Sequence, residues 1–178
     1  CTQLEGTIEA LALQEDAPTT EILVVYDGDA ARLRARLAPI AAPNLRVVAE
    51  PAFGLNAKRN RGLAEAAAPR VPFTDDDCVP DPRWVTSMAA ALDRFPCVTG
   101  RVLPLGDGVR ASVRTGARAR DFRGAAAALL PWQAGCGNDL GVRRDLVDAI
   151  GPFDERIGVG TWSAAACDTE FLFRALRA

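Results

Sequence analysis

Histidine is absent from all 178 residues of the sequence. Catalytic Ser-His-Asp and Cys-His triads, and every zinc site that uses histidine, are therefore excluded within this chain. The five cysteines are scattered, with no two close enough for a CxxC clip, which is typical of a protein from a reducing compartment. A metal ion in this protein is therefore expected to take oxygen ligands.

Long apolar runs are also missing, since none approaches the roughly 20 residues that a membrane helix needs. The chain has 21 basic and 23 acidic residues, whereas a protein that binds nucleic acid regardless of sequence carries a basic excess. We therefore expect no nucleic-acid partner. Hydrophobic residues make up 49% of the chain and charged residues 25%, which is the composition of a globular domain with a sizeable core.

The apolar pattern predicts helices alternating with strands. Helices are expected over 2–16, 29–37, 81–95, 144–150 and 168–176 and after 53–56, and strands over 21–26, 45–49, 71–74, 98–105 and 138–142. Residues 106–130 indicate a long loop with some helix, and 151–163 a glycine-rich loop. This alternation is typical of a single α/β domain whose sheet is largely parallel and flanked by helices.

Three consecutive aspartates, Asp75, Asp76 and Asp77, follow the strand predicted over 71–74. Ligands of α/β sheets bind beyond the carboxyl ends of the strands, and adjacent carboxylates repel one another unless a cation relieves the repulsion. Because Mg²⁺ and Mn²⁺ prefer carboxylate and phosphate oxygens, the cluster predicts a divalent-metal site. On an extended chain, Asp75 and Asp77 would point to one side and Asp76 to the other. The alternative is a polar turn that leads to a helix cap at Asp81.

Asp27, Lys58 and Arg59 each allow two interpretations. Asp27 follows the strand predicted over 21–26, so it either shares a cleft with the three aspartates or belongs to a simple turn. Lys58 and Arg59 lie near a helix start, where their side chains would either bind a phosphate or form a solvated helix face.

Three features of the C-terminal part are also ambiguous. The glycines of 135–138 allow either close approach to a ligand or a simple bend. Asp168 precedes an amphipathic helix and is either a helix cap or a general base within reach of a substrate hydroxyl. Trp162 either stacks on a sugar or pins its loop to the core.

Five segments, in order, resemble the family-two glycosyltransferases, whose nucleotide-sugar-binding fold is called GT-A. Residues 21–29 resemble the family's strand ending in two acids, 54–63 its Arg-Asn helix, 73–84 its DXD segment, 137–144 with 151–155 its acceptor-side stretch, and 167–174 its Glu-Asp motif with the arginine. The resemblance covers nearly the whole chain and implies one GT-A domain over 1–178. Residues 1–105 would form its nucleotide-sugar half and 106–178 its acceptor half.

The resemblance implies a role for each matching residue. Asp77 would bind Mg²⁺ or Mn²⁺ on the donor diphosphate, Asp75 would contact the nucleoside, and Asp27 would help to hold the base. Asp168 would deprotonate the acceptor hydroxyl in a single, inverting displacement. The expected nucleotide-sugar residues are Tyr26, Asp27, Lys58, Arg59, Asp75 and Asp76, and the expected acceptor-side residues are Gly137, Asn138 and Trp162.

The chain departs from the family pattern at three places. Tyr26 replaces the first acid of the nucleotide-side pair, and Cys167 replaces the glutamate before the expected base. The family's opening strand is not seen, and the sequence starts without methionine and ends inside a predicted helix, so we expect a piece cut at both ends. The missing strand would leave an open sheet edge and weak donor binding.

The sequence favours a metal-dependent, inverting sugar transferase that uses a nucleotide-diphosphate donor. By family analogy, the acceptor is a glycan, a lipid-linked sugar or a small molecule in surface glycan or glycolipid synthesis. The same analogy suggests a cytoplasmic protein, and peripheral association with the inner face of the membrane is compatible with such an acceptor. The alternatives are a degenerate nucleotide-sugar-binding domain, which Tyr26 and Cys167 favour, a nucleotidyltransferase, and a haloacid-dehalogenase-like phosphatase, which Val79 disfavours because a hydroxyl residue is expected there.

Overall fold

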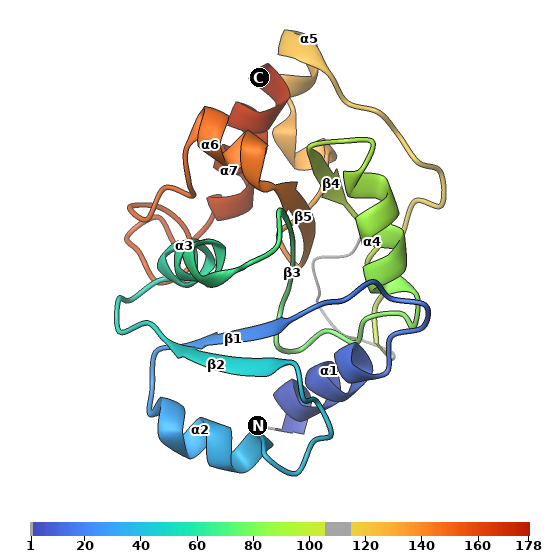
Figure 1. Cartoon of the computed structure of the whole chain (residues 1–178). Coiled ribbons are helices and arrows are strands. Elements are labelled where there is room, and N and C mark those ends of the chain that lie inside the picture. Colours follow the sequence, from blue (N-terminus) through green and yellow to red (C-terminus); the bar gives the residue numbers. More distant parts are fainter. Residues whose placement is uncertain (1, 106–114) are drawn as a thin grey trace.

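The structure, a computed structural model, describes residues 2–105 and 115–178. The helices are α1 (Thr2–Ala12), α2 (Ala30–Leu37), α3 (Leu55–Glu65), α4 (Trp84–Leu92), α5 (Gly124–Ala128), the 3₁₀ turn η1 (Pro131–Gln133), α6 (Arg144–Ile150) and α7 (Cys167–Arg177). The strands are β1 (Ile22–Tyr26), β2 (Leu45–Ala49), β3 (Arg70–Thr74), β4 (Cys97–Thr99) and β5 (Asp139–Arg143). Helices alternate with strands through most of the chain, which confirms the α/β class (Figure 1).

The strands form two separate sheets. β1 and β2 pair in parallel, with Ile22 opposite Leu45 and Tyr26 opposite Ala49. In the second sheet β5 lies between β3 and β4 and is antiparallel to both. The first sheet is therefore parallel, whereas both strand pairs of the second sheet are antiparallel. β3, α4 and β4 form a crossover that leaves a gap between its two strands. After a long connection the chain returns to this gap from the opposite end, so β5 runs antiparallel to both neighbours.

Several element boundaries differ from the expected ones. α4 begins at Trp84 rather than at Asp81, because Asp81 forms a turn in which its carbonyl accepts a hydrogen bond from the Trp84 N–H at 2.8 Å. β4 ends at Thr99, well before residue 105. α1 ends at Ala12, before the expected end at residue 16. Residues 106–114 lie outside the described residues, so the expected loop over 106–130 is described only from residue 115.

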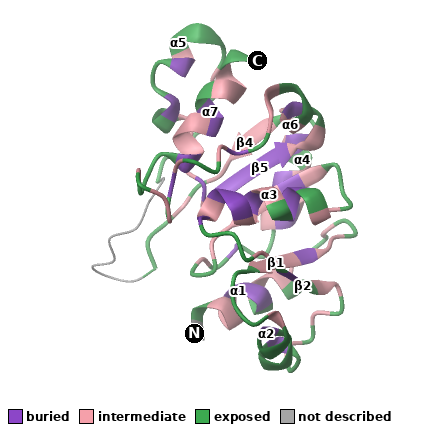
Figure 2. Ribbon diagram, turned by 90° about the vertical axis from the view of Figure 1, so that its left-hand side faces the viewer, coloured by how far each residue is buried: buried purple, intermediate pink, exposed green. Residues whose placement is uncertain are grey.

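The core consists of two hydrophobic clusters, one under each sheet. The larger cluster joins β3 and β5 to α3 and α7 and contains Leu63, Val71, Leu140, Val142, Phe153, Phe171 and Leu172. The smaller one lies between the parallel sheet and the helices α1 and α2 and contains Ile8, Leu33, Leu37 and Val47. Figure 2 shows β5 as the most continuously buried strand of the molecule.

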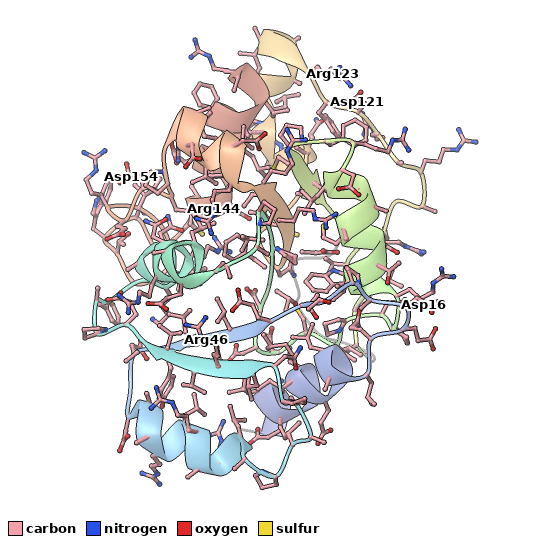
Figure 3. All side chains as sticks on the ribbon, viewed as in Figure 1. Asp16, Arg46, Asp121, Arg123, Arg144 and Asp154 are labelled. Atoms are coloured by element: carbon pink, nitrogen blue, oxygen red, sulfur yellow. The ribbon has the colours of Figure 1, made fainter. Side chains whose placement is uncertain are left out.

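Two asparagines of α3 fix this helix to the loop that follows α6. Asn60 and Phe153 exchange hydrogen bonds at 2.9 Å, and the Asn56 amide donates to the carbonyls of Asp154 and Ile157. Arg144, at the start of α6, donates to the carbonyl of Ala66 just beyond α3 (Figure 3). The helix that carries Lys58 and Arg59 is thereby held at a fixed place against the C-terminal part of the chain.

None of the described helices combines the length and apolarity needed to cross a bilayer.

Candidate active site

The three aspartates form a turn at the carboxyl end of β3. The Cys78 N–H donates to the Asp75 carbonyl at 3.3 Å, so the segment is not extended and the expected alternation of the three side chains does not apply. Thr7 of α1 fixes the turn, because its hydroxyl lies 3.1 Å from the Asp76 carbonyl and 2.6 Å from the Cys78 carbonyl. The polar turn is therefore present, and the metal site at the same three aspartates stays a prediction.

Asp75 is the member of the turn that faces inward. Burial raises the pKa of Asp75, and the carboxylates of Asp77, Asp76 and Asp168 raise it further, while the Arg59 guanidinium opposes them. Arg59 is only 6% exposed, so the interpretation of Arg59 as part of a solvated helix face is wrong. A positive charge therefore lies buried among acidic side chains at the end of β3.

The Arg59 guanidinium is held by stacking as well as by charge. Its central carbon lies 5.3 Å from the centroid of the Phe153 ring. Among the described residues, its buried Nη1 has no hydrogen-bond partner. A buried donor without a partner is unfavourable, so this group favours an additional acceptor, such as a bound anion.

Asp168 lies in the first turn of α7 and is oriented by two backbone groups. Its Oδ2 accepts a hydrogen bond from the Gly137 N–H at 2.8 Å, and its Oδ1 accepts one from the Thr169 N–H at 2.9 Å. Gly137 lies directly against Arg59, since a Cβ added at this glycine would be 2.2 Å from the Arg59 Nη2. The 135–138 segment is expected to approach a ligand or to form a simple bend, and in the structure the backbone of Gly137 lies against Arg59 and contacts Asp168.

The expected nucleotide-sugar residues lie around one cavity of about 640 Å³. They are Tyr26, Asp27, Lys58, Arg59, Asp75 and Asp76, whereas Asp77 does not line it. Asp27 pairs with Lys58 at 2.6 Å, and the hydrogen bond from Lys58 lowers the pKa of Asp27. The structure therefore brings the ends of β1 and β3 to a common cavity, as the sequence predicts.

The acceptor-side residues are more dispersed. Gly137 contacts Asp168, and the side-chain oxygen of Asn138 lies 2.7 Å from the Cys136 thiol. Trp162 is 88% exposed, so it does not pin its loop to the core. Of the two interpretations of Trp162, only the one that leaves its ring available to a ligand is compatible with the structure.

A divalent ion would have to share its ligands with a substrate. In the part of the chain that the structure describes, no three carboxylate, cysteine or histidine side chains are grouped closely enough to hold a metal. Mg²⁺ commonly takes one or two carboxylates, and substrate phosphates and water complete its shell. The Asp77 carboxylate, on an open turn beside other acidic groups, fits this kind of shared site.

Sequence reasoning missed a buried carboxylate beside the site. Asp139 is 8% exposed, burial raises its pKa, and its Oδ1 accepts a hydrogen bond from the Trp84 indole at 2.8 Å. Both residues lie inside segments that carry the family resemblance. No local pattern could show that they meet, because 55 positions separate them along the chain. Phe153, which stacks under Arg59, was missed for the same reason.

A comparison with protein-family models assigns residues 2–151 to "Glycosyl transferase family 2". The chain belongs to this family. The match covers most of the chain, including β1, the Lys58–Arg59 helix and the aspartate turn, but it ends before Trp162 and Asp168. The search of curated proteins returns no match.

The family-2 domain also resembles solved transferase structures. S. aureus TarS 1–349 matches with a TM-score of 0.71 and 20% identity over 98% of this chain and 51% of that one. The TarS complex with UDP-GlcNAc matches with a TM-score of 0.72 and 21% identity, over 98% and 50%. The Pyrobaculum calidifontis mannosyltransferase PcManGT, in complex with GDP-Man and Mn²⁺, matches with a TM-score of 0.58 and 22% identity, over 89% and 46%. These matches show the GT-A-type fold, and the chain spans about half the length of the structures it matches.

Proposed function

We propose that this glycosyltransferase domain moves a sugar from a nucleotide-diphosphate donor to an acceptor hydroxyl, with a divalent metal and with inversion. The observation that carries the proposal is the proximity of Asp168 to the aspartate turn. Gly137 contacts both Asp168 and Arg59, and the Asp168 charge contributes to the raised pKa of Asp75. A candidate base and a candidate donor site thus adjoin one another, although they are far apart along the chain.

The donor would lie at the carboxyl ends of β1 and β3. Asp27 and Asp75 offer carboxylate acceptors to a base and a ribose, and Arg59 offers the buried donor that has no partner among the described residues. Asp77 would hold Mg²⁺ or Mn²⁺. Such an ion, when bound, offsets the negative charge of the departing nucleoside diphosphate.

Asp168 would act as the base. The hydrogen bonds from Gly137 and Thr169 leave each carboxylate oxygen with further acceptor capacity, so the side chain can take the proton of an acceptor hydroxyl while its orientation is fixed. The oxygen would then attack the sugar carbon on the face opposite to the leaving group. One displacement of this kind inverts the configuration at that carbon.

For the acceptor we propose a sugar hydroxyl on a glycan or glycolipid intermediate, in the cytoplasm at the inner face of the membrane. The support from the chain is an exposed apolar surface made by Phe53, Val159 and Trp162, which are 77%, 57% and 88% exposed. The Leu55 N–H donates to the Val159 carbonyl at 3.0 Å, so the two segments lie side by side.

Trp162→Ala is expected to raise the KM for acceptor and to leave donor affinity unchanged. Unchanged acceptor kinetics would contradict this role.

Calorimetric titration of UDP and of GDP, with and without Mn²⁺, tests the donor site. We expect binding that needs the metal and that Asp77→Ala abolishes. Asp148→Ala, which removes an exposed carboxylate from α6, is the matched control and should bind like the parent chain. Metal-independent binding that survives Asp77→Ala would refute the metal role, and it would favour a binding-only domain if transfer were also absent.

Substitution of the base separates chemistry from binding. Asp168→Asn keeps the size of the side chain and an oxygen for the Gly137 N–H, but it removes the proton acceptor. We expect unchanged donor affinity and a loss of kcat on the order of 10²- to 10⁴-fold. Normal turnover would show that another group is the base. Membership of a glycosyltransferase family disfavours the phosphatase alternative.

A further inference from the structure

Thr7 lies between its own helix, α1, and the aspartate turn. It is only 4% exposed, and three backbone carbonyls lie within reach of its hydroxyl. The Gln3 carbonyl, of the kind to which a threonine in a helix often donates, is the most distant at 3.3 Å, whereas the Asp76 and Cys78 carbonyls lie at 3.1 and 2.6 Å. Because a hydroxyl has a single proton to donate, the shortest contact shows that Thr7 bonds the turn rather than its own helix.

The two carbonyls of the turn that Thr7 contacts belong to the residues immediately before and after Asp77. One side chain of α1 therefore holds the backbone on both sides of Asp77. Within the residues that the structure describes, the one group that bonds the Asp77 carboxylate is the Cys78 thiol, at 3.8 Å. A thiol is a weak donor, so the direction of this carboxylate depends on the backbone that carries it.

α1 is a firm support for this contact. Ile8, the residue after Thr7, is 1% exposed and packs in the smaller hydrophobic cluster, between α1, α2 and the parallel sheet. Close packing of this kind fixes the position of a helix. The Thr7 hydroxyl is thereby placed at a defined position relative to the sheet.

A separate set of bonds holds the residues that follow the turn. In Figure 1, the chain passes beside α1 on its way from β3 to α4. The Gln14 amide donates to the Asp81 carbonyl at 2.8 Å, and its oxygen accepts from the Val85 N–H at 2.7 Å. The Thr86 hydroxyl donates to the Glu15 carbonyl at 2.8 Å. These bonds fix the start of α4 by themselves, so the bond to the aspartate turn can be removed separately.

The placement of Asp77 is important because the protein supplies few ligands here. In the described part of the chain, the turn is not accompanied by a closed set of three acidic, cysteine or histidine ligands. Mg²⁺ demands a nearly ideal octahedral geometry and is commonly bound through one or two carboxylates. An ion with so few protein ligands is sensitive to the direction of each of them.

We propose that Thr7 is a positioning residue for the metal carboxylate of this domain. Its hydroxyl holds the peptide groups on either side of Asp77, and this sets the direction in which the carboxylate meets a divalent ion. Thr7 acts through Asp77 and is not itself a ligand. The inference rests on the proposed metal-dependent donor site, and it adds to that site a residue from a different element of the fold.

Titration of Mn²⁺ in the presence of UDP or of GDP tests this role. Thr7→Val keeps the shape of the side chain but removes the hydroxyl, and we expect the Mn²⁺ concentration that half-saturates nucleotide binding to rise about 10- to 100-fold. Thr7→Ser keeps the hydroxyl and should restore the parent value. Thr86→Val is the matched control, because it removes a threonine hydroxyl that bonds another backbone carbonyl away from Asp77. It should leave the Mn²⁺ requirement unchanged.

Amide hydrogen exchange without metal gives a second measurement. The Cys78 N–H closes the turn on the Asp75 carbonyl at 3.3 Å, so Thr7→Val should speed its exchange. The Val85 N–H, which donates to Gln14, is the internal reference and should exchange as in the parent chain. Thr7→Ala removes the same hydroxyl without a second methyl group against the turn. It should give the same results, so a misfit of valine does not decide the outcome.

Three results would overturn the inference. One is a parent-like Mn²⁺ requirement, or unchanged Cys78 exchange, in folded Thr7→Val and Thr7→Ala. Another is an equal rise of the Mn²⁺ requirement in Thr86→Val, which would indicate a general loss of stability. The third is a failure of Thr7→Ser to restore binding, since the hydroxyl would then not be the group that matters. If neither nucleotide binds the parent chain with Mn²⁺, the proposed function fails instead, and Cys78 exchange alone decides whether Thr7 holds the turn.

Discussion

β5 and β1 have the same length but very different surroundings. β5 is Asp-Leu-Gly-Val-Arg, with two charged residues and a glycine, yet four of its five residues are buried. β1 is entirely apolar apart from its tyrosine hydroxyl, yet only one of its five residues is buried. Within residues 2–105 and 115–178, β5 has a strand on each side, whereas β1 pairs with β2 alone. Burial of a strand in this protein is therefore decided by its place in the sheet more than by its own composition.

The largest expected difference between the two regions comes from the same substitution in each strand. Leu140 of β5 is fully buried, so Leu140→Ala should lower the free energy of unfolding by about 2–5 kcal/mol. Leu23 of β1 is only partly buried, so Leu23→Ala should cost about 1 kcal/mol or less, because less apolar area is lost. Urea denaturation of both variants measures the contrast. Equal losses would show that β1 is as well packed as β5.

The next largest effect concerns the hydrogen bond that anchors the start of β5. Trp84→Phe removes the indole donor to Asp139 and should lower the free energy of unfolding at neutral pH by about 1–3 kcal/mol. Trp162→Phe, at an exposed ring, is the control and should change it little.

The effect of Trp84→Phe should also depend on pH. Burial raises the folded-state pKa of Asp139, so its protonated form favours folding below the unfolded pKa, and this stability is lost as the pH rises through the folded pKa. The indole opposes that shift by stabilising the carboxylate. The cost of Trp84→Phe should therefore be largest above the folded pKa and should shrink in acid. Denaturation curves between neutral and acidic pH measure this trend, and a cost that grew in acid would contradict it.

The smallest expected change is a gain of stability in the region around the parallel sheet. Gly6 lies inside α1 with no atom near the position of an added Cβ, so Gly6→Ala should raise the free energy of unfolding by about 0.5–1 kcal/mol. Gly141→Ala in β5 is the opposing test. Its Cβ would lie 2.6 Å from the Met88 sulfur and 3.1 Å from Leu92, so it should destabilise. Thermal unfolding of both variants checks the signs, and a stabilising Gly141→Ala would show that β5 has spare room.

Local patterns predicted most of the elements. The strand over 21–26, the helix over 29–37 and the strand over 45–49 all appear close to their expected bounds, because each depends on neighbouring residues. The wrong predictions concern features that depend on contacts between residues far apart along the chain. β4 ends at Thr99 because its pairing with β5 extends only that far, and β5 runs antiparallel because of the route by which the chain returns.

In the candidate site too, local sequence identified individual residues, whereas distant contacts decided how they are grouped. The sequence identified the acidic turn, Arg59 and Asp168 as separate candidates with two interpretations each. Their grouping depends on Gly137, which allows Asp168 and Arg59, distant along the chain, to approach one another. Asp139 and Phe153 were not predicted, because their roles depend on Trp84 and Arg59, which are distant along the chain.

The sequence by itself determined the α/β class, the family and the chemistry available at the strand ends, since these follow from local periodicity and from motifs in a fixed order. Only the tertiary structure decided which strands pair and which charges are buried together. The physical reason is that burial and strand pairing depend on contacts between segments far apart along the chain. Leu23 and Leu140 are the same residue type in strands of equal length, and the neighbours that the fold supplies make one of them half-buried and the other fully buried.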